Sequence, residues 1–67
     1  MTFGQRLRSL RAEHGVSQDV LARRTDIHAT AIGRFERGDR EPRLSSILRL
    51  ARGLGVEPGE LVNGLDL

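Results

Sequence analysis

Hydrophobic residues recur along the chain at three- and four-residue spacing, in five short runs that polar residues and glycines separate. Such spacing places side chains on one face of a helix, and no stretch shows the strict alternation typical of a strand. The pattern predicts helices over residues 3–14, 18–24, 29–37, 44–53 and 58–62. We therefore expect an all-α fold, and 67 residues are enough for a single compact domain (residues 1–67) with a modest core.

The same spacing predicts which side chains form that core. Each helix should turn its apolar positions inward, away from its charged ones. The predicted inward positions are Phe3, Leu7, Leu10 and His14 in the first helix, Val20, Leu21 and Ala22 in the second, Ile32 and Phe35 in the third, and Leu44, Ile47, Leu48, Ala51 and Leu54 in the fourth.

Capping residues support these boundaries. Thr2 precedes the first helix with Gln5 three residues later, which predicts a capping box, and Ser17 is suited to cap the second helix. Gly15 and Gly38 follow the first and third helices, where a left-handed residue commonly ends a helix. Pro58 suits the first turn of the last helix.

Composition adds little until the charges are placed. The pI is about 11.0, but the net charge is only +2, because all eleven cations are arginine and no lysine, tyrosine or cysteine titrates at intermediate pH. Arginine in place of lysine is also typical of GC-rich genomes, so only the placement argues for function. Arg34 lies within the third helix, and Arg37, Arg40 and Arg43 follow it closely. Guanidinium forks bind phosphate and guanine acceptors in pairs.

Several classes of protein are disfavoured by what the sequence lacks. Without cysteine it has neither disulfides nor thiolate metal ligands, and His14 and His28 are too isolated to indicate a zinc site. No apolar run approaches ~18 residues and no signal peptide is recognisable, so we expect a soluble cytoplasmic protein with no membrane contact. No nucleophile stands with a base and no carboxylates pair, so we expect no enzyme, no cofactor and no small-molecule ligand.

The order and spacing of these residues resemble the Cro/C1-type (XRE) helix-turn-helix family over about residues 3–63. The residues that carry the resemblance are Gly15-Val16-Ser17-Gln18, Leu21-Ala22, Ile27, Ile32, Phe35-Glu36-Arg37-Gly38, Pro42, Leu50-Ala51 and Leu54-Gly55-Val56. The resemblance implies a compact five-helix, lambda-repressor-like fold. It also implies a bacterial or phage transcription regulator at the nucleoid, most often a repressor that binds a pseudo-palindromic operator in double-stranded DNA as a homodimer.

In this family the third helix enters the DNA major groove. The resemblance therefore makes Ala29, Thr30, Gly33 and Arg34 candidates for base contact on the exposed side of that helix. Arg34 suits guanine O6 and N7, while Ala29 and the Thr30 methyl suit thymine methyl groups. Arg34 could instead bind phosphate or solvent, and Gly33 could be either a point of close approach or a mild helix defect.

Phosphate contacts are implied at the two ends of the motif. Ser17 and Gln18 open the second helix, where free N–H groups and the helix dipole favour an anion. Arg37 ends the third helix, and Arg40 and Arg43 follow it. These arginines would position the DNA backbone without reading its sequence. Each of these side chains alone could equally be a solvated surface residue.

A helix-to-helix ion pair is the last residue role that the resemblance implies. Arg11 in the first helix and Glu36 in the third match the family's partly buried pair in type and position. Three residues depart from the family pattern: Asp26 replaces the common glycine of the turn, while His28 and Arg43 stand where serine or threonine often caps a helix.

Two questions stay open in the sequence. Leu61, Val62, Leu65 and Leu67 could form a dimer contact, or Leu61 and Val62 could complete the monomer's core and leave residues 63–67 as a flexible tail. The second is the partner: an antitoxin-like or co-regulator module on this fold would bind protein. Such a module should show apolar anchors on the outer side of the third helix, and their absence favours DNA.

Overall fold

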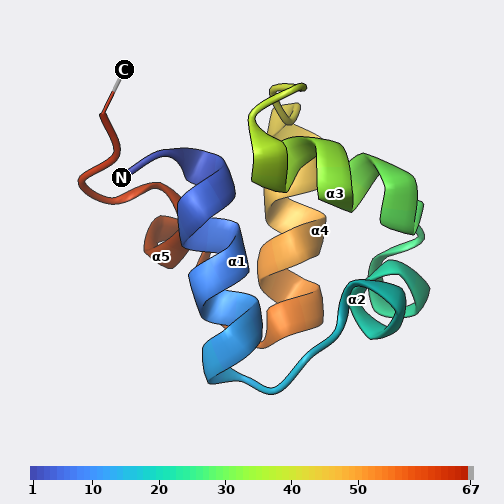
Figure 1. Cartoon of the computed structure of the whole chain (residues 1–67). Helices are drawn as coiled ribbons and strands as arrows, with labels where there is room; N and C mark the ends of the chain where they lie inside the picture. Colours follow the sequence, from blue (N-terminus) through green and yellow to red (C-terminus); the bar gives the residue numbers. More distant parts are fainter. Residues whose placement is uncertain (67) are drawn as a thin grey trace.

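Five helices account for most of the computed structural model, which describes residues 1–66 (Figure 1). They are α1 (Phe3–Glu13), α2 (Gln18–Thr25), α3 (Ala29–Arg37), α4 (Leu44–Leu54) and α5 (Pro58–Val62), with no strand in this part of the chain. The all-α five-helix prediction is confirmed, and each helix ends within one residue of its predicted limit. None of these helices combines the length and the apolar character that crossing a membrane requires.

Local hydrogen bonds explain why the boundaries were predictable. Thr2 Oγ1 accepts from the Gln5 N–H at 3.2 Å and Gln5 Oε1 accepts from the Thr2 N–H at 2.9 Å, which completes the predicted capping box. Ser17 Oγ caps α2 by accepting from the Val20 N–H at 3.1 Å. A bond that we did not predict joins the Glu57 N–H to Glu60 Oε2 at 3.0 Å and supports the start of α5.

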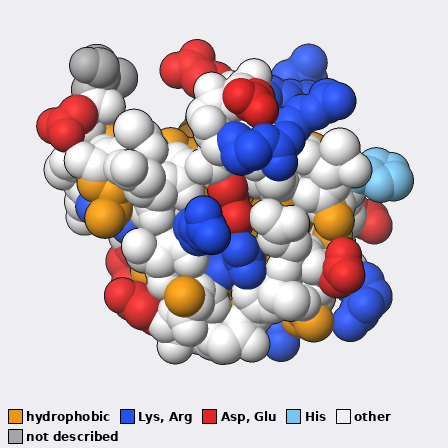
Figure 2. Space-filling model, in the orientation of Figure 1, with side chains coloured by type: hydrophobic (Ala, Val, Ile, Leu, Met, Phe, Trp, Pro, Cys, Tyr) orange, Lys and Arg blue, Asp and Glu red, His pale blue; other side chains and the backbone are white. Residues whose placement is uncertain are grey.

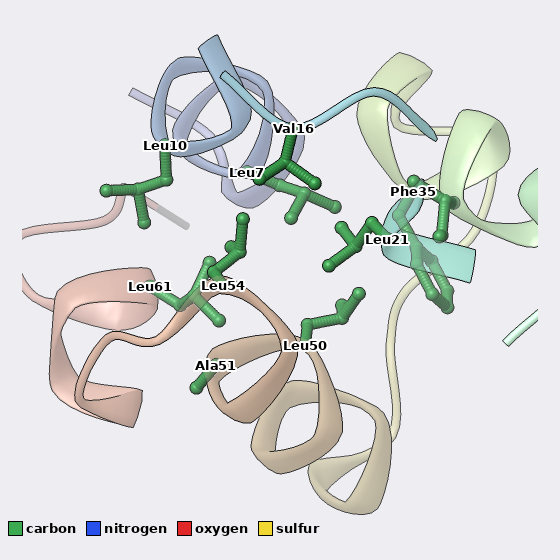
Figure 3. Packing of buried hydrophobic residues seen from close by; sticks show 10 residues of the cluster. Leu7, Leu10, Val16, Leu21, Phe35, Leu50, Ala51, Leu54 and Leu61 are labelled. Carbon is green, nitrogen blue, oxygen red and sulfur yellow. The ribbon is translucent and has the colours of Figure 1, made fainter. Parts of the chain in front are cut away.

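The core lies where the five helices converge, and each contributes one side chain with no exposed surface (Figure 3). These side chains are Leu7, Leu21, Ile32, Leu50 and Leu61. Burying an aliphatic side chain of this size contributes about 1.5–3 kcal/mol. Phe3 of α1 meets Phe35 of α3 edge-on, with ring centroids 6.4 Å apart, so aromatic packing also joins these two helices.

The predicted inner face of α4 is partly wrong. Leu50, Ala51 and Leu54 are buried and Ile47 is half-buried, whereas Leu44 and Leu48 are 72% and 48% exposed. The helix is rotated about its axis relative to the predicted orientation. The reason is that α2 and α5 both pack against it, and together they select the side that carries Leu50. His14 is also exposed rather than inward, since it lies at the C-cap of α1.

Leu61 belongs to the monomer's core, which removes it from the predicted dimer patch. Val62 is 43% exposed and Leu65 is half-buried, while Leu67 lies outside the described residues. Arg6 donates to the carbonyl oxygens of Glu60 and Asn63 at 2.6 and 2.9 Å, so it holds the end of α5 against α1.

The residues after α5 are also attached to the start of the chain. The Met1 amino group donates to Asp66 at 2.9 Å and the Asp66 N–H donates to the Met1 carbonyl at 3.3 Å. The Met1 ammonium holds the pKa of the Asp66 carboxyl below its ordinary value, through the hydrogen bond and its charge. Residues 63–66, for which a flexible tail was one of two alternatives, are therefore bonded to Met1 and Arg6 at the start of the chain.

Candidate nucleic-acid interface

A left-handed residue makes the sharp turn between α2 and α3. Asp26 is at the C-cap of α2 with φ 61° and ψ 23°, and its N–H donates to the Ala22 carbonyl. Among non-glycine residues aspartate is one of the more tolerant of this region, so the turn keeps its shape without the glycine. The side chain of Thr25 secures the same turn, because its hydroxyl donates to the Leu21 carbonyl at 2.7 Å and accepts from the Ile27 N–H.

The turn presents α3 with one face against the protein and one face outward. Ile32 and Phe35 are buried, with 0% and 3% exposure, as predicted. Thr30 and Arg34 are exposed and Ala29 is half-exposed. No other segment among residues 1–66 covers this side, so small and cationic side chains form its outer surface.

Gly33 is buried, so its predicted exposure on the outer side is wrong. Two long polar side chains cover it. A Cβ added at Gly33 would lie 3.1 Å from Arg37 Nη1 and 3.8 Å from Gln18 Nε2. The glycine therefore leaves room for these two side chains to cross α3 at this point.

Arg11 of α1 and Glu36 of α3 form a two-point ion pair where these helices meet. Arg11 Nε donates to Glu36 Oε2 at 2.6 Å and Arg11 Nη2 donates to Glu36 Oε1 at 2.9 Å. The side chains are only 16% and 5% exposed. Arg11 Nη1 also donates to the Val16 carbonyl at 3.0 Å, so the pair holds α1, α3 and the loop before α2 together.

Burial alone would raise the pKa of the Glu36 carboxyl. Hydrogen bonds from Arg11 and Gln18, together with the charges of Arg11 and Arg8, outweigh burial and hold that pKa below its ordinary value. The hydrogen bond to Glu36 in turn raises the pKa of Arg11, against an opposing contribution from its own burial. Both groups are therefore charged at neutral pH, and each depends on the other for compensation.

The two residues predicted to open α2 toward phosphate already have partners within the protein. Gln18 Nε2 donates to Glu36 Oε1 at 3.0 Å, and the Ser17 hydroxyl is used in the helix cap. The backbone N–H groups of Gln18 and Asp19 stay free of intrahelical acceptors, as in any first helical turn. The anion-binding capacity at this end therefore belongs to the backbone more than to the Ser17 side chain.

An open hollow of about 230 Å³ forms where α1, α2 and α3 meet, and we call it the polar hollow. Its lining residues are Arg8, Arg11, Gln18, Gly33, Glu36 and Arg37. Figure 2 shows basic side chains around an acidic group in the middle of this face, between α1 and α3. Sequence reasoning missed Arg8; the available signal was its place one turn before Arg11 on the same face of α1.

The three arginines after Arg34 are all exposed, at the end of α3 and in the loop that follows. Arg37 pairs with Asp39 at 3.1 Å, and the Arg40 guanidinium stacks on the Phe35 ring at 5.7 Å from its centroid. Arg43 is at the N-cap of α4 and makes no side-chain capping bond, and His28 at the N-cap of α3 makes none either. The side chain of Arg43 is therefore exposed and is not used in a helix cap, and its contact with phosphate stays a prediction.

A helix, a left-handed turn and a second helix with an uncovered polar face define a helix-turn-helix domain, and comparison with known proteins agrees. A family model described as a helix-turn-helix domain matches residues 2–65. Control protein C.BamHI from Bacillus amyloliquefaciens is 38% identical over 64 residues, which cover 94% of this chain and 79% of the relative.

Solved structures give the same result. The restriction-modification controller protein C.AhdI from Aeromonas hydrophila is 47% identical, with a TM-score of 0.87 over 90% of this chain and 91% of the other. The P22 c2 repressor, solved in complex with a synthetic operator, is 28% identical, with a TM-score of 0.85 over 96% and 97% of the two chains. The chain belongs to the Cro/C1-type helix-turn-helix family of transcription regulators.

Proposed function

We propose that the chain is a sequence-specific DNA-binding regulator that places α3 in the major groove. One observation carries the proposal: the outer side of α3 is uncovered and bears Ala29, Thr30 and Arg34, with no apolar anchor for a protein. Arg34 would donate to guanine O6 and N7, and the methyl groups of Ala29 and Thr30 would meet thymine methyls. Gly33, under Arg37 and Gln18, would contribute by its lack of bulk, not by a contact of its own.

Phosphates would be held on both sides of the groove. The free N–H groups at the start of α2 suit one strand, with Gln18 and Arg37 at the rim of the polar hollow. Arg40 and Arg43, in the loop between α3 and α4, are placed to bind phosphates of the other DNA strand. Such contacts orient α3 and make affinity depend on salt, with a slope of about −0.9 per phosphate neutralised.

Selection of bound sequences from a random DNA pool tests the proposal, followed by anisotropy titrations of the selected site at several salt concentrations. We expect a recurrent site and affinity that falls steeply with salt. Failure to enrich any duplex, or an affinity independent of salt, would contradict it. In that event the antitoxin-like or co-regulator alternative, in which this fold binds protein, would be favoured.

Substituting Arg34 and Arg40 separates base reading from phosphate binding. Arg34→Ala should cost about 1–3 kcal/mol on the selected site and relax preference at one base pair, because a bidentate pair to guanine is lost. Arg40→Ala should weaken selected and unrelated duplexes alike. Anisotropy on the selected site, single-base variants and an unrelated duplex measures both effects. A loss at Arg40 that is confined to one base pair would overturn its role.

We further propose that the chain acts as a homodimer on a pseudo-palindromic operator, with half-sites ~34–36 Å apart. The candidate surface is the exposed apolar side of α4, with Leu44 and Leu48, next to exposed Val62 on α5. Beside it an open groove of about 500 Å³ contains Phe3, Ile47 and Val62. Together these replace the C-terminal leucines as the expected dimer contact.

Leu48→Glu tests this surface. In an isologous interface the substitution occurs twice, and each buried leucine contributes about 1.5–3 kcal/mol, so the dimer should weaken more than about a hundredfold. Sedimentation equilibrium measures the change. Ala12→Glu is the control, because Ala12 is exposed on α1 and the substitution adds the same charge. A native chain that sediments as a monomer at high concentration, or equal behaviour of the two variants, would exclude this surface.

Bound across an operator, such a dimer would repress by blocking polymerase in the bacterial cytoplasm. The family consists of regulators, not enzymes. The restriction-modification controller protein C.AhdI, at 47% identity, favours genes of a restriction-modification system as the regulated set. A reporter gene fused to the promoter of a restriction-modification gene, measured with and without the chain, tests this assignment. Unchanged expression from a promoter that contains a selected site would contradict it.

A further inference from the structure

A cluster of exposed arginines lies on a part of the surface that the proposed DNA contacts do not use. Two are in the last turn of α2 and two are on α4, and with Thr25 and Asp26 they line an open hollow of about 320 Å³. We call these four residues the arginine patch: Arg23, Arg24, Arg49 and Arg52.

The arginine patch carries more positive charge than its surroundings neutralise. The ion pairs within residues 1–66 join Met1 to Asp66, Arg11 to Glu36 and Arg37 to Asp39, so none includes the patch. Asp26 is the sole acidic residue among those lining this hollow. Cations favour helix C-termini, which explains those in the last turns of α2 and α4, but Arg49 lies before the last turn of α4.

The position of the patch separates it from the proposed DNA surface. It is at the C-terminal end of α2, whereas the polar hollow opens at Gln18, the first residue of the helix. A helix of eight residues is ~12 Å long. α2 packs against both α3 and α4, and Figure 1 shows α3 crossing in front of α4. A duplex along the outer side of α3 therefore leaves the α4 side of α2 free.

We propose that the arginine patch is a docking site for an acidic segment of a partner protein. Carboxylates accept two hydrogen bonds from a guanidinium fork, so several carboxylates on one strand match forks from two helices. In an extended strand alternate side chains are ~6.6 Å apart on one side, close enough for successive carboxylates to enter one small hollow. A second duplex fits less well, because its convex surface is much wider than the hollow.

This inference goes beyond the proposed function and does not depend on it. It gives the chain a protein partner that it can hold while α3 holds DNA. The probe is a fluorescein-labelled peptide of alternating glutamate and glycine, with its glutamine counterpart as the uncharged control. Binding is measured by anisotropy at an ionic strength of ~0.15 M, where distant charges are screened.

Two variants with the same loss of charge distinguish the surfaces. Arg23→Gln with Arg49→Gln should weaken the glutamate peptide about tenfold, because charge-assisted bonds from both helices are lost. It should leave duplex affinity within about twofold, and circular dichroism melting confirms that it folds. Arg34→Gln with Arg37→Gln should do the reverse, retaining the peptide and losing the duplex.

Four results would overturn the proposal. The native chain could fail to bind the glutamate peptide, or bind the glutamine peptide as well. The two double variants could lose the peptide equally, which would indicate attraction by net charge alone. The patch variant could lose duplex affinity and salt dependence, which would assign the patch to DNA. The peptide result stands whether or not the native chain selects an operator.

Discussion

Replacing Gly4 with alanine is expected to destabilise the protein by up to about 2 kcal/mol, because α1 and α3 meet at this residue with no room for a methyl group. An added Cβ would contact the Phe35 carbonyl oxygen and would lie 2.5 Å from that of Glu36. Both are backbone atoms, so the whole helix must move away, and overpacking of this kind costs about 1–3 kcal/mol. The better helix propensity of alanine, about 1 kcal/mol, offsets only part of this.

Gly33→Ala is the matched control, since it is also a buried glycine within a helix. There the nearest atom is the flexible end of Arg37, at 3.1 Å, which can swing aside. This variant should therefore be more stable than the native chain by about 0.5–1 kcal/mol. Urea unfolding monitored by circular dichroism measures both. A Gly4→Ala variant as stable as the native chain, or two variants that change in the same direction, would contradict the packing described.

The helix boundaries could be predicted because local groups determine them. Thr2 with Gln5 and Ser17 satisfy N–H groups within three residues. A left-handed residue is the C-cap of α2, α3 and α4. The rotation of α4 about its axis could not be predicted from the sequence. Apolar residues occupy so much of its circumference that the spacing permits either side, and contacts with α2 and α5 select the one that buries Leu50.

Gly33 shows the same limit at the candidate site. On a helical wheel it falls on the outer side of α3, and its neighbours in sequence do not indicate otherwise. It is buried because Gln18, fifteen residues earlier, reaches over it toward Glu36 while Arg37 crosses from the next turn. Exposure can be predicted from spacing only where no long side chain from another helix covers the position. Arg8 was missed for a related reason, since its role depends on where α1 meets α3.

The Arg11–Glu36 pair was recognised through family resemblance, because no spacing rule links residues twenty-five apart in sequence. Its geometry shows what it does. It fixes α1 against α3, and through Gln18 it fixes the start of α2 as well. The uncovered side of α3 therefore has a set orientation relative to the free N–H groups of α2, which a groove-binding surface requires.

Glu36→Gln is accordingly expected to lower the free energy of unfolding by about 3 kcal/mol at neutral pH. The substitution keeps the shape of the side chain but leaves the Arg11 guanidinium, 16% exposed, without a counter-charge. Breaking one partner of a buried pair costs about 3–5 kcal/mol, and a chain of this size has about 3–10 kcal/mol in total. Asp39→Asn is the control, because it removes an exposed pair in which both side chains are more than half exposed. That change should cost under about 1 kcal/mol.

Acid should reduce the difference between the native chain and Glu36→Gln. Because the pKa of Glu36 is lower in the folded protein than its ordinary value of about 4.5, its stabilisation is fully present above that value. It is lost as the pH falls through the lower folded pKa, where the carboxylate takes up a proton. Urea unfolding of both proteins from neutral pH to about pH 3 measures the difference. A gap that stays constant across this range would show that the charge of Glu36 does not stabilise the fold, and that the hydrogen bonds alone hold α1 against α3.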